Sequence, residues 1–301
     1  MKVLVTGGAG FIGSHTVDLL IDRGHKVVVV DNLSSGRQAN VNEKAKLYKI
    51  DIGRLDSLRI PFGQFEPEAV LHLAAQPSLR YSLDYPGEDA AINIIGTLNV
   101  IEACREFSVK HIVFASTSAV YDPNGMPPFL EDDPLNPNLP YGIAKLAGEH
   151  YVRALCPSHT ILRYGNVYGP RQVPVGENQL IARALKYMRA KGDFVVNGSG
   201  EQSRDFVYVG DVARANHLAL TRQYRQTFNV GTGKGTPVME VLRRLAEMTH
   251  YAGEFAHGPH KSGEAYHVAL NSERFAALGW RPETSLSEGL RLTAEAAKAD
   301  L

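Results

Sequence analysis

The first 160 residues alternate between short apolar runs of strand length and longer amphipathic stretches. The apolar runs cover residues 2–6, 26–30, 45–50, 69–73 and 111–115. Apolar residues recur at helical spacing after residue 11, around residues 90–107 and along residues 141–155. Strands that alternate with helices are typical of a parallel sheet with helices on both faces. The pattern therefore predicts an α/β fold built on a doubly wound parallel sheet.

The first strand leads directly into a glycine-rich turn and a helix. The turn has the sequence Gly7-Gly8-Ala9-Gly10-Phe11-Ile12-Gly13. Glycines there let the backbone approach a pyrophosphate at the positive end of the helix, as in Rossmann dinucleotide sites. Asp31 ends the next strand, 18 residues after Gly13, where its carboxylate can hold both ribose hydroxyls and repel a 2′-phosphate. We expect NAD rather than NADP; the alternative is a glycine-rich turn in a fold without nucleotide.

Other residues follow the strands at the same expected edge, where ligands of doubly wound sheets bind. They are Asn32, Asp51, Ile52, Leu73, Ala74 and Ala75. Asp51 is either an acceptor for the adenine amine or the N-cap of the next helix. Asn93 lies inside the helical pattern of residues 90–107 and is either a hydrogen-bonding core residue or a cofactor contact.

A tyrosine and a lysine four residues apart occur twice in the chain. Residues four apart on a helix project from one face. Tyr141 and Lys145 follow a strand that ends at Thr117, so a hydroxyl, a phenol and an ammonium can converge on one nicotinamide. Tyr187 and Lys191 follow no such strand. The first pair is therefore predicted to be the site, and the second to lie on the surface.

Composition narrows the classes of partner. The 32 basic and 32 acidic residues cancel, so no overall field favours nucleic acid or an anionic membrane. The N-terminus enters a strand and a glycine-rich turn without a cleavage site or a 20-residue apolar span, which predicts a cytoplasmic protein. Cys104 and Cys156 fall in apolar helical patterns and are interpreted as buried, reduced thiols. His257 and His260 lack neighbouring cysteines or carboxylates, so no metal is expected.

These residues resemble the extended short-chain dehydrogenase/reductase superfamily, and within it the UDP-glucose (UDP-galactose) 4-epimerases and their nucleotide-sugar relatives. The resemblance covers nearly the whole chain, through residues 6–15, 31–36, 72–76, 93–99, 114–121, 140–145, 163–171, 198–212 and 228–233. It implies an NAD-binding Rossmann domain at residues 1–165 and a nucleotide-sugar lobe at residues 166–301. Residues 205–232 or so are expected to pack back onto the first domain.

The resemblance also implies roles for individual residues. Thr117 corresponds to the family's catalytic Ser/Thr, Tyr141 to its base, and Lys145 to the lysine that binds the nicotinamide ribose. Tyr164 and Asn166 would flank the nicotinamide and the sugar diphosphate. Substrate contacts are further implied for Asn178, Arg204, Lys261, Glu264 and Val268.

The implied chemistry requires a phenol that loses its proton near neutral pH. A unit positive charge about 6 Å away, at an effective dielectric of ~20, is worth about 2.8 kcal/mol or ~2 pKa units. Lys145 and a cationic nicotinamide are together expected to lower the pKa of Tyr141 from about 10 to roughly 6–7.

The residues after Thr117 favour epimerisation among the reactions of the superfamily. Related 4,6-dehydratases carry Asp-Glu after this threonine, and sugar-acid decarboxylases a Glu two residues on. Here Ser118 and Ala119 occupy those positions. The implied activity is NAD-dependent 4-epimerisation of a UDP-hexose through a transient 4-keto sugar. The alternatives are another nucleotide-sugar oxidoreductase, such as a reductase or dehydratase, and a non-catalytic regulator.

Two positions depart from the family pattern or bear on substrate range. Lys261 stands where the family has a second diphosphate arginine; it keeps the charge but loses the bidentate fork. Val268 falls near the residue that gates the sugar pocket, and its small side chain leads to the hypothesis that N-acetylated sugars are also accepted. The paired long helices at residues 90–107 and 141–155 imply a homodimer by resemblance.

Overall fold

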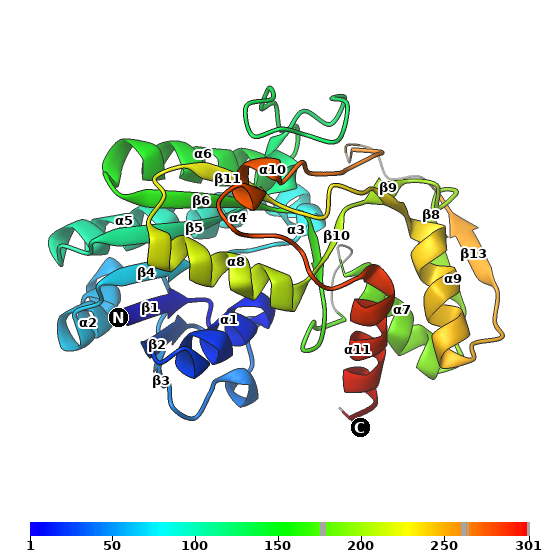
Figure 1. Cartoon of the computed structure of the whole chain (residues 1–301), viewed down its shortest axis with the longest axis horizontal. Coiled ribbons are helices and arrows are strands. Elements are labelled where there is room, and N and C mark those ends of the chain that lie inside the picture. The colour runs from blue at the N-terminus through cyan, green and yellow to red at the C-terminus, as the bar shows by residue number, and fades with distance from the viewer. Residues whose placement is uncertain (175–178, 260–262, 264, 300–301) are drawn as a thin grey trace.

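A central parallel sheet organises the molecule. A computed structural model of the chain describes residues 1–174, 179–259, 263 and 265–299. Its seven-stranded sheet has the order β11-β6-β5-β4-β1-β2-β3 (Figure 1). The strands are β1 (Lys2–Thr6), β2 (Lys26–Asp31), β3 (Lys46–Lys49), β4 (Ala69–His72), β5 (His111–Thr117), β6 (His159–Tyr164) and β11 (Thr227–Val230). Every neighbouring pair is parallel, which confirms the predicted doubly wound sheet.

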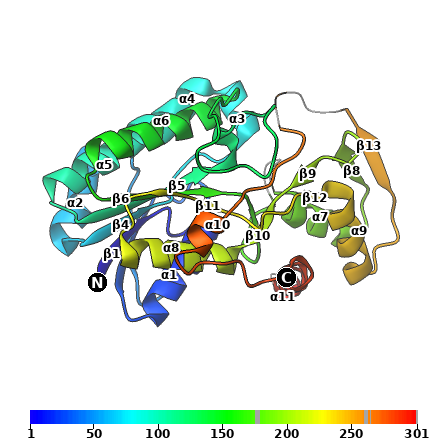
Figure 2. The same cartoon turned by 45° about the horizontal axis from the view of Figure 1, so that its top comes forward.

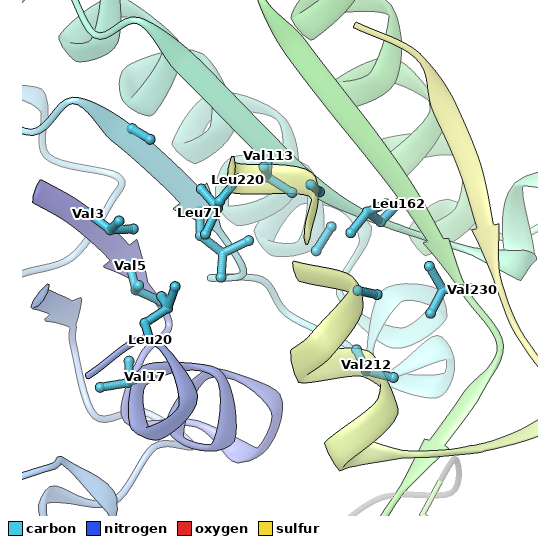
Figure 3. Close-up of a cluster of buried hydrophobic side chains, with 14 of the residues drawn as sticks. Val3, Val5, Val17, Leu20, Leu71, Val113, Leu162, Val212, Leu220 and Val230 are labelled. Atoms are coloured by element: carbon cyan, nitrogen blue, oxygen red, sulfur yellow. The ribbon is translucent and has the colours of Figure 1, made fainter. Parts of the chain in front are cut away.

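Both faces of the sheet are buried because the strands are apolar on both sides. Val5 and Val29 face one core while Leu4 and Val28 face the other, as the two-residue repeat of a strand requires. Helices α1 (Phe11–Asp22) and α8 (Val209–Arg222) cover the first face, shown in Figure 3. The second face packs against α2 (Leu55–Phe65), α5 (Gly96–Glu106) and α6 (Pro140–Leu155). Cys104 and Cys156 lie buried as free thiols in this second core, as expected.

The helix expected at residues 90–107 begins earlier and changes geometry. Pro86 starts α4 (Pro86–Ala90), and one π-helical turn, η2 (Ala91–Ile95), connects α4 to α5 with helical dihedral angles at both junctions. Proline suits a first helical position because its missing N–H would have no partner there. Single π turns inside α-helices are frequent at functional sites. Here the turn contains the buried Asn93.

A smaller lobe lies beyond the carboxyl-terminal edge of the sheet (Figures 1 and 2). Its strands pair as β8 (Phe194–Asn197) with β13 (Phe255–Gly258) and β9 (Ser203–Arg204) with β12 (Thr236–Pro237); β7 (Asn166–Tyr168) pairs with β10 (Phe206–Tyr208). Its helices are α7 (Leu180–Arg189), α9 (Val238–Thr249) and α11 (Leu286–Ala299). The remaining short helices are η1 (Gln38–Asn40), α3 (Leu79–Asp84), η3 (Ser118–Val120) and α10 (Glu273–Ala276).

The C-terminal half of the chain returns to the sheet more than once. Helix α8 packs on α1, and β11 forms the edge strand beside β6. Phe275 of α10 and Trp280 belong to the same core as the sheet. The domain boundary near residue 165 stays a prediction. In the part of the chain that the structure describes, no helix is both long and apolar enough to cross a membrane.

Candidate active site

The glycine-rich turn is packed so closely against the chain's own backbone that two of its positions have no space for a side chain. Gly7 has a φ of +71°, and a Cβ added to it would lie 2.7 Å from the backbone nitrogen of Ala74. A Cβ on Gly13 would lie 2.1 Å from the carbonyl oxygen of Gly7. Helix α1 starts at Phe11, and its N-cap Gly10 supplies no side-chain hydrogen bond. The amides of Phe11 and the next residues are therefore available to an anion, which fits a dinucleotide pyrophosphate.

Asp31 joins the end of β2 to this turn. Its Oδ2 accepts a hydrogen bond from the backbone amide of Ala9 at 3.0 Å, and its Oδ1 accepts from the amide of Leu33 at 2.8 Å. Each carboxylate oxygen keeps a lone pair, so ribose hydroxyls can still donate to it. A Cβ on Gly36 would lie 2.9 Å from Oδ1, so the glycine there keeps this oxygen unobstructed. These features fit the adenosine end of NAD.

Asp51 is not a helix cap. The N-cap of α2 is Arg54, and Asp51 instead accepts from the amide of Gly53 at 2.7 Å and from the side chain of Asn32 at 2.8 Å. The N-cap alternative is thus wrong, because the turn at Gly53 separates Asp51 from the helix. Contacts of Asp51 and Asn32 with adenosine stay predictions. So does a contact of Ile52, whose buried side chain packs closely against Gly96.

Asn93 fixes the loop that follows β4. Its Oδ1 accepts from the amide of Gln76, and its Nδ2 donates to the carbonyl of the same residue, each at 3.0 Å. The amides of Leu73 and Ala74 donate to the backbone and side-chain oxygens of Thr6. The loop through Leu73, Ala74 and Ala75 is therefore held at both ends. Asn93 is a core hydrogen-bonding residue, and its contact with the cofactor stays a prediction.

His72 at the end of β4 continues this network, although the sequence analysis did not single it out. Its Nε2 donates to Thr97, whose hydroxyl donates onward to the carbonyl of Asn93. Nδ1 of His72 therefore accepts from the Thr6 hydroxyl, at 2.7 Å. Burial, with a smaller contribution from Lys145, lowers the pKa of His72 to about 3. The imidazole is thus neutral and serves to orient the strand end.

Thr117 and Tyr141 meet at the carboxyl end of β5. Thr117 is paired in register with Tyr164 of β6, and its hydroxyl accepts from the amide of Ala119 at 3.2 Å. The same hydroxyl is hydrogen-bonded to the Tyr141 phenol in the first turn of α6. Tyr164 is buried and donates to Asn216 of α8 at 2.6 Å, so its hydroxyl is directed into the core. The expected contact of Tyr164 with the nicotinamide stays a prediction.

Lys145 lies one turn along α6 and is 3% exposed. Its Nζ stands 4.2 Å from the centroid of the Phe114 ring. Among the described residues no hydrogen-bond acceptor contacts this ammonium, so its three donors are available to a ligand. That arrangement fits a lysine that binds ribose hydroxyls.

The chain by itself does not produce the low phenol pKa expected from the sequence. Burial raises the pKa of Tyr141 to about 12, although the Thr117 hydrogen bond opposes this, and Asp89 raises it further. Burial also lowers the pKa of Lys145 to about 8, against the attraction of Glu149 and Asp89. The expectation included a cationic nicotinamide and did not count the cost of burying a phenolate, so for the site with the cofactor bound it stays a prediction.

A buried ion pair anchors α6 one turn beyond Lys145. Glu149 is fully buried and accepts from Nε and Nη2 of Arg163 at 2.9 and 2.7 Å. It also accepts from Ser116 at 2.5 Å and from Arg153 at 2.6 Å. Since Ser116 precedes Thr117 on β5, this cluster sets the helix that carries Tyr141 against the strand that carries Thr117.

We expect Glu149→Gln to lower the free energy of unfolding by about 3–5 kcal/mol, because Arg163 is left buried without its full counter-charge. Urea denaturation measures it. The control is Glu106→Gln, whose exposed pair with Arg59 should contribute less than about 1 kcal/mol.

The pH dependence of this effect has a definite sign. Arg163 holds the pKa of Glu149 below its usual value. The stability that the ionised Glu149 contributes is therefore complete above the pKa of a glutamate in the unfolded chain. It is lost as the pH falls through the lower pKa of Glu149 in the folded protein. The difference in the free energy of unfolding between wild type and Glu149→Gln should therefore become smaller in acid. A difference below about 1 kcal/mol at neutral pH would contradict the structural role of Glu149.

The expected substrate residues are only partly within the described chain. Asn178, Lys261 and Glu264 lie outside it. The amide of Asn166 donates to the carbonyl of Asp205 at 2.7 Å. Arg204 donates to the carbonyls of Ser203 and Tyr266, while the amide of the buried Val268 donates to the carbonyl of Ser203 at 3.1 Å. Arg204 belongs to β9 and Val268 is hydrogen-bonded to the same strand, and the substrate contacts of both stay predictions.

The second tyrosine–lysine pair lacks a comparable environment. Tyr187 is 43% exposed on α7, and Lys191 lies past the end of that helix with a φ of 51°. In the described residues, no three histidine, cysteine or carboxylate side chains gather into a group that could hold a metal ion.

Comparison with known proteins agrees with this site. Residues 3–231 match the NAD dependent epimerase/dehydratase family. A putative UDP-glucose 4-epimerase of Methanocaldococcus jannaschii is 41% identical over 295 residues, which cover 96% of this chain and 96% of that protein.

Two solved structures share the complete fold. UDP-glucose 4-epimerase of Thermotoga maritima with UDP-glucose has a TM-score of 0.95 at 42% identity, with coverage of 100% of this chain and 99% of that one. The Thermus thermophilus UDP-glucose 4-epimerase complex with NAD has a TM-score of 0.95 at 39% identity, and each chain is covered completely. The chain described here belongs to the NAD-dependent epimerase/dehydratase family of the short-chain dehydrogenase/reductase superfamily.

Proposed function

We propose that the chain is an NAD-dependent 4-epimerase that interconverts UDP-galactose and UDP-glucose through a transient 4-keto sugar. The observation that carries this proposal is the hydrogen-bonded pair of Thr117 and Tyr141, followed after Thr117 by Ser118 and Ala119 rather than by acids. A redox site without a second acid can oxidise and reduce a carbinol but lacks a group for elimination. The names of the relatives at 41% and 42% identity support the same activity.

Each residue of the site then has a defined role. When bound on the glycine-rich turn and Asp31, NAD supplies an acceptor that takes a hydride from C4 of the sugar and can return it. Tyr141 accepts the proton of the 4-hydroxyl during oxidation and returns it during reduction. Thr117 orients that hydroxyl through its bond to the phenol. Lys145 places a positive charge near the developing phenolate and donates to ribose hydroxyls.

The test is to mix purified protein with UDP-galactose, without added cofactor, and to quantify UDP-glucose. Interconversion without net accumulation of reduced cofactor is expected. Stoichiometric reduced cofactor would indicate another oxidoreductase of the family, and binding without any turnover would indicate a regulator. Either result would overturn the proposal.

Substrate range depends on Val268. We expect UDP-glucose and UDP-N-acetylglucosamine to be turned over at comparable rates because a small side chain leaves room for the N-acetyl group. Val268→Leu should reduce turnover of the N-acetylated sugar selectively, on the order of 10-fold or more, as one added carbon in a pocket can do. The control is Val195→Leu, at a residue 51% exposed on β8. A strict preference of the wild type for the smaller sugar would contradict this hypothesis.

A homodimer formed through α5 and α6 is part of the proposal. Its support is three exposed apolar side chains on α6 and on the π turn η2, which packs against α6 and leads into α5: Ile95 at 51%, Ile143 at 51% and Tyr151 at 40% exposure. Such side chains are typical of surfaces that are covered in an assembly. A cytoplasmic location stays a prediction.

A further inference from the structure

Asp89 is a buried carboxylate beside the catalytic helix. It lies in α4 and is 1% exposed. Its Oδ1 accepts from Nε2 of Gln76 at 2.8 Å and from Nδ2 of Asn93 at 2.9 Å. Both donors are neutral amides, and no described residue forms an ion pair with Asp89. Its charge is therefore oriented but not neutralised by a direct partner.

The elements packed against α4 determine which charges Asp89 meets. They are α3, η2 and α6. The sequence of η2 contains no ionisable side chain. On α3, Arg80 pairs with Asp84, and Tyr81 donates to Glu88 rather than to Asp89. The ionisable groups of α3 are thus engaged elsewhere.

The groups that remain come from α6 and belong to the reaction. The charge of Asp89 contributes to the pKa shifts of both Tyr141 and Lys145. Lys145 in turn is the charged group that contributes to the pKa shift of Asp89. Glu149 raises the Lys145 pKa more than Asp89 does, but its carboxylate is paired with Arg163 and Arg153. Asp89, in contrast, has no cationic partner in an ion pair among the described residues.

We propose that Asp89 is a positioning residue of the active site: through Gln76 and Asn93 it fixes the loop after β4, and from α4, packed on α6, it adds a second negative charge to that of Glu149 beside the catalytic residues. The effect of Asp89 on kcat rests on the proposed epimerase function, whereas its effect on the pKa of Tyr141 does not. Burial is the main cause that raises the pKa of Tyr141 and lowers that of Lys145; the charge of Asp89 adds to the first shift and, after that of Glu149, opposes the second, since it disfavours the phenolate and favours the ammonium. The working pH range of the site is thereby moved upward.

Asp89→Asn tests this role because asparagine keeps the shape and one oxygen acceptor while removing the charge. The pH profile of kcat is expected to move to lower pH on both limbs, on the order of one pH unit, because loss of a negative charge lowers the pKa of both groups. A residue with a merely structural role would lower kcat without moving the limbs. Glu88→Gln, at the exposed neighbour, should leave the profile unchanged.

A second readout does not need turnover. Tyrosinate absorbance, measured as the difference between a protein with Tyr141 and its Tyr141→Phe counterpart, reports the pKa of this one phenol. That pKa is expected to fall when Asp89→Asn is introduced. If wild type fails to interconvert UDP-sugars, the epimerase proposal fails, but this titration still decides the role of Asp89.

An unchanged or raised Tyr141 pKa in Asp89→Asn, with a thermal unfolding midpoint near that of wild type, would overturn the proposal. If Asp89→Asn does not fold, Gln76→Met replaces it. Methionine removes one of the two amide donors that hold Asp89 and the loop after β4 but leaves the carboxylate charged in the alkaline range, so kcat should fall while the Tyr141 pKa stays near that of wild type. A folded Gln76→Met protein with the kcat of wild type would likewise overturn the role of Asp89 in holding the loop after β4.

Discussion

Tyr141→Phe is expected to remove the interconversion of UDP-galactose and UDP-glucose, with a loss in kcat of roughly 10²–10⁴-fold or more. The phenol is the group that Thr117 contacts directly at the end of β5, and phenylalanine cannot accept or return a proton. The substitution keeps the ring, so the packing of α6 should survive. Initial rates of UDP-glucose formation under saturating substrate measure the effect.

The chain supplies its own matched control for this substitution. Tyr187→Phe changes the same residue type in the second tyrosine–lysine pair, on the exposed face of α7. Its kcat should equal that of wild type. Activity retained by Tyr141→Phe, or lost equally by both variants, would show that Tyr141 is not the base.

Gly13→Ala should abolish retention of NAD through purification. The new Cβ would lie 2.1 Å from the carbonyl oxygen of Gly7 and 2.8 Å from Cα of Gly8. Since these are backbone atoms, the turn and the start of α1 must move apart, and the cradle for the pyrophosphate changes shape. The added cost to stability is about 1–3 kcal/mol, as for other overpacked sites. Chromatography of the nucleotide released by denaturation quantifies bound NAD.

Gly87→Ala is the corresponding control, because a Cβ at Gly87 of α4 meets no atom within 4 Å. It should keep NAD and be neutral or more stable by roughly 0.4–1 kcal/mol. Equal NAD content in Gly13→Ala and wild type would contradict the assignment of the turn as the dinucleotide site.

The strands and helices were predictable where the pattern of apolar residues is local. The strand that begins at residue 111 ends at Thr117, as expected, because its polar last residues still pair with β6. The helix of residues 90–107 extends back to Pro86, which suits a first helical position. The return of Phe275 to the core of the sheet depends on contacts between distant segments. No local pattern reports those contacts.

The site was predictable as a set of positions but not as an electrostatic environment. Placement after a strand distinguished Tyr141 from Tyr187. Sequence spacing does not report burial, so the rise in the Tyr141 pKa was missed. Asp89 and His72 were missed for a related reason, since their roles come from hydrogen bonds to residues on other elements. A polar residue inside an apolar pattern was the one signal available for His72.

The central claim is that C4 loses a hydride and regains the same hydride on its other face. The direct measurement uses UDP-galactose that carries deuterium at C4, incubated with the protein in ordinary water. Mass spectrometry and NMR of the product should show UDP-glucose with the deuterium still at C4 and the configuration there inverted. Product that carries solvent hydrogen at C4, or deuterium released into free cofactor, would contradict the account.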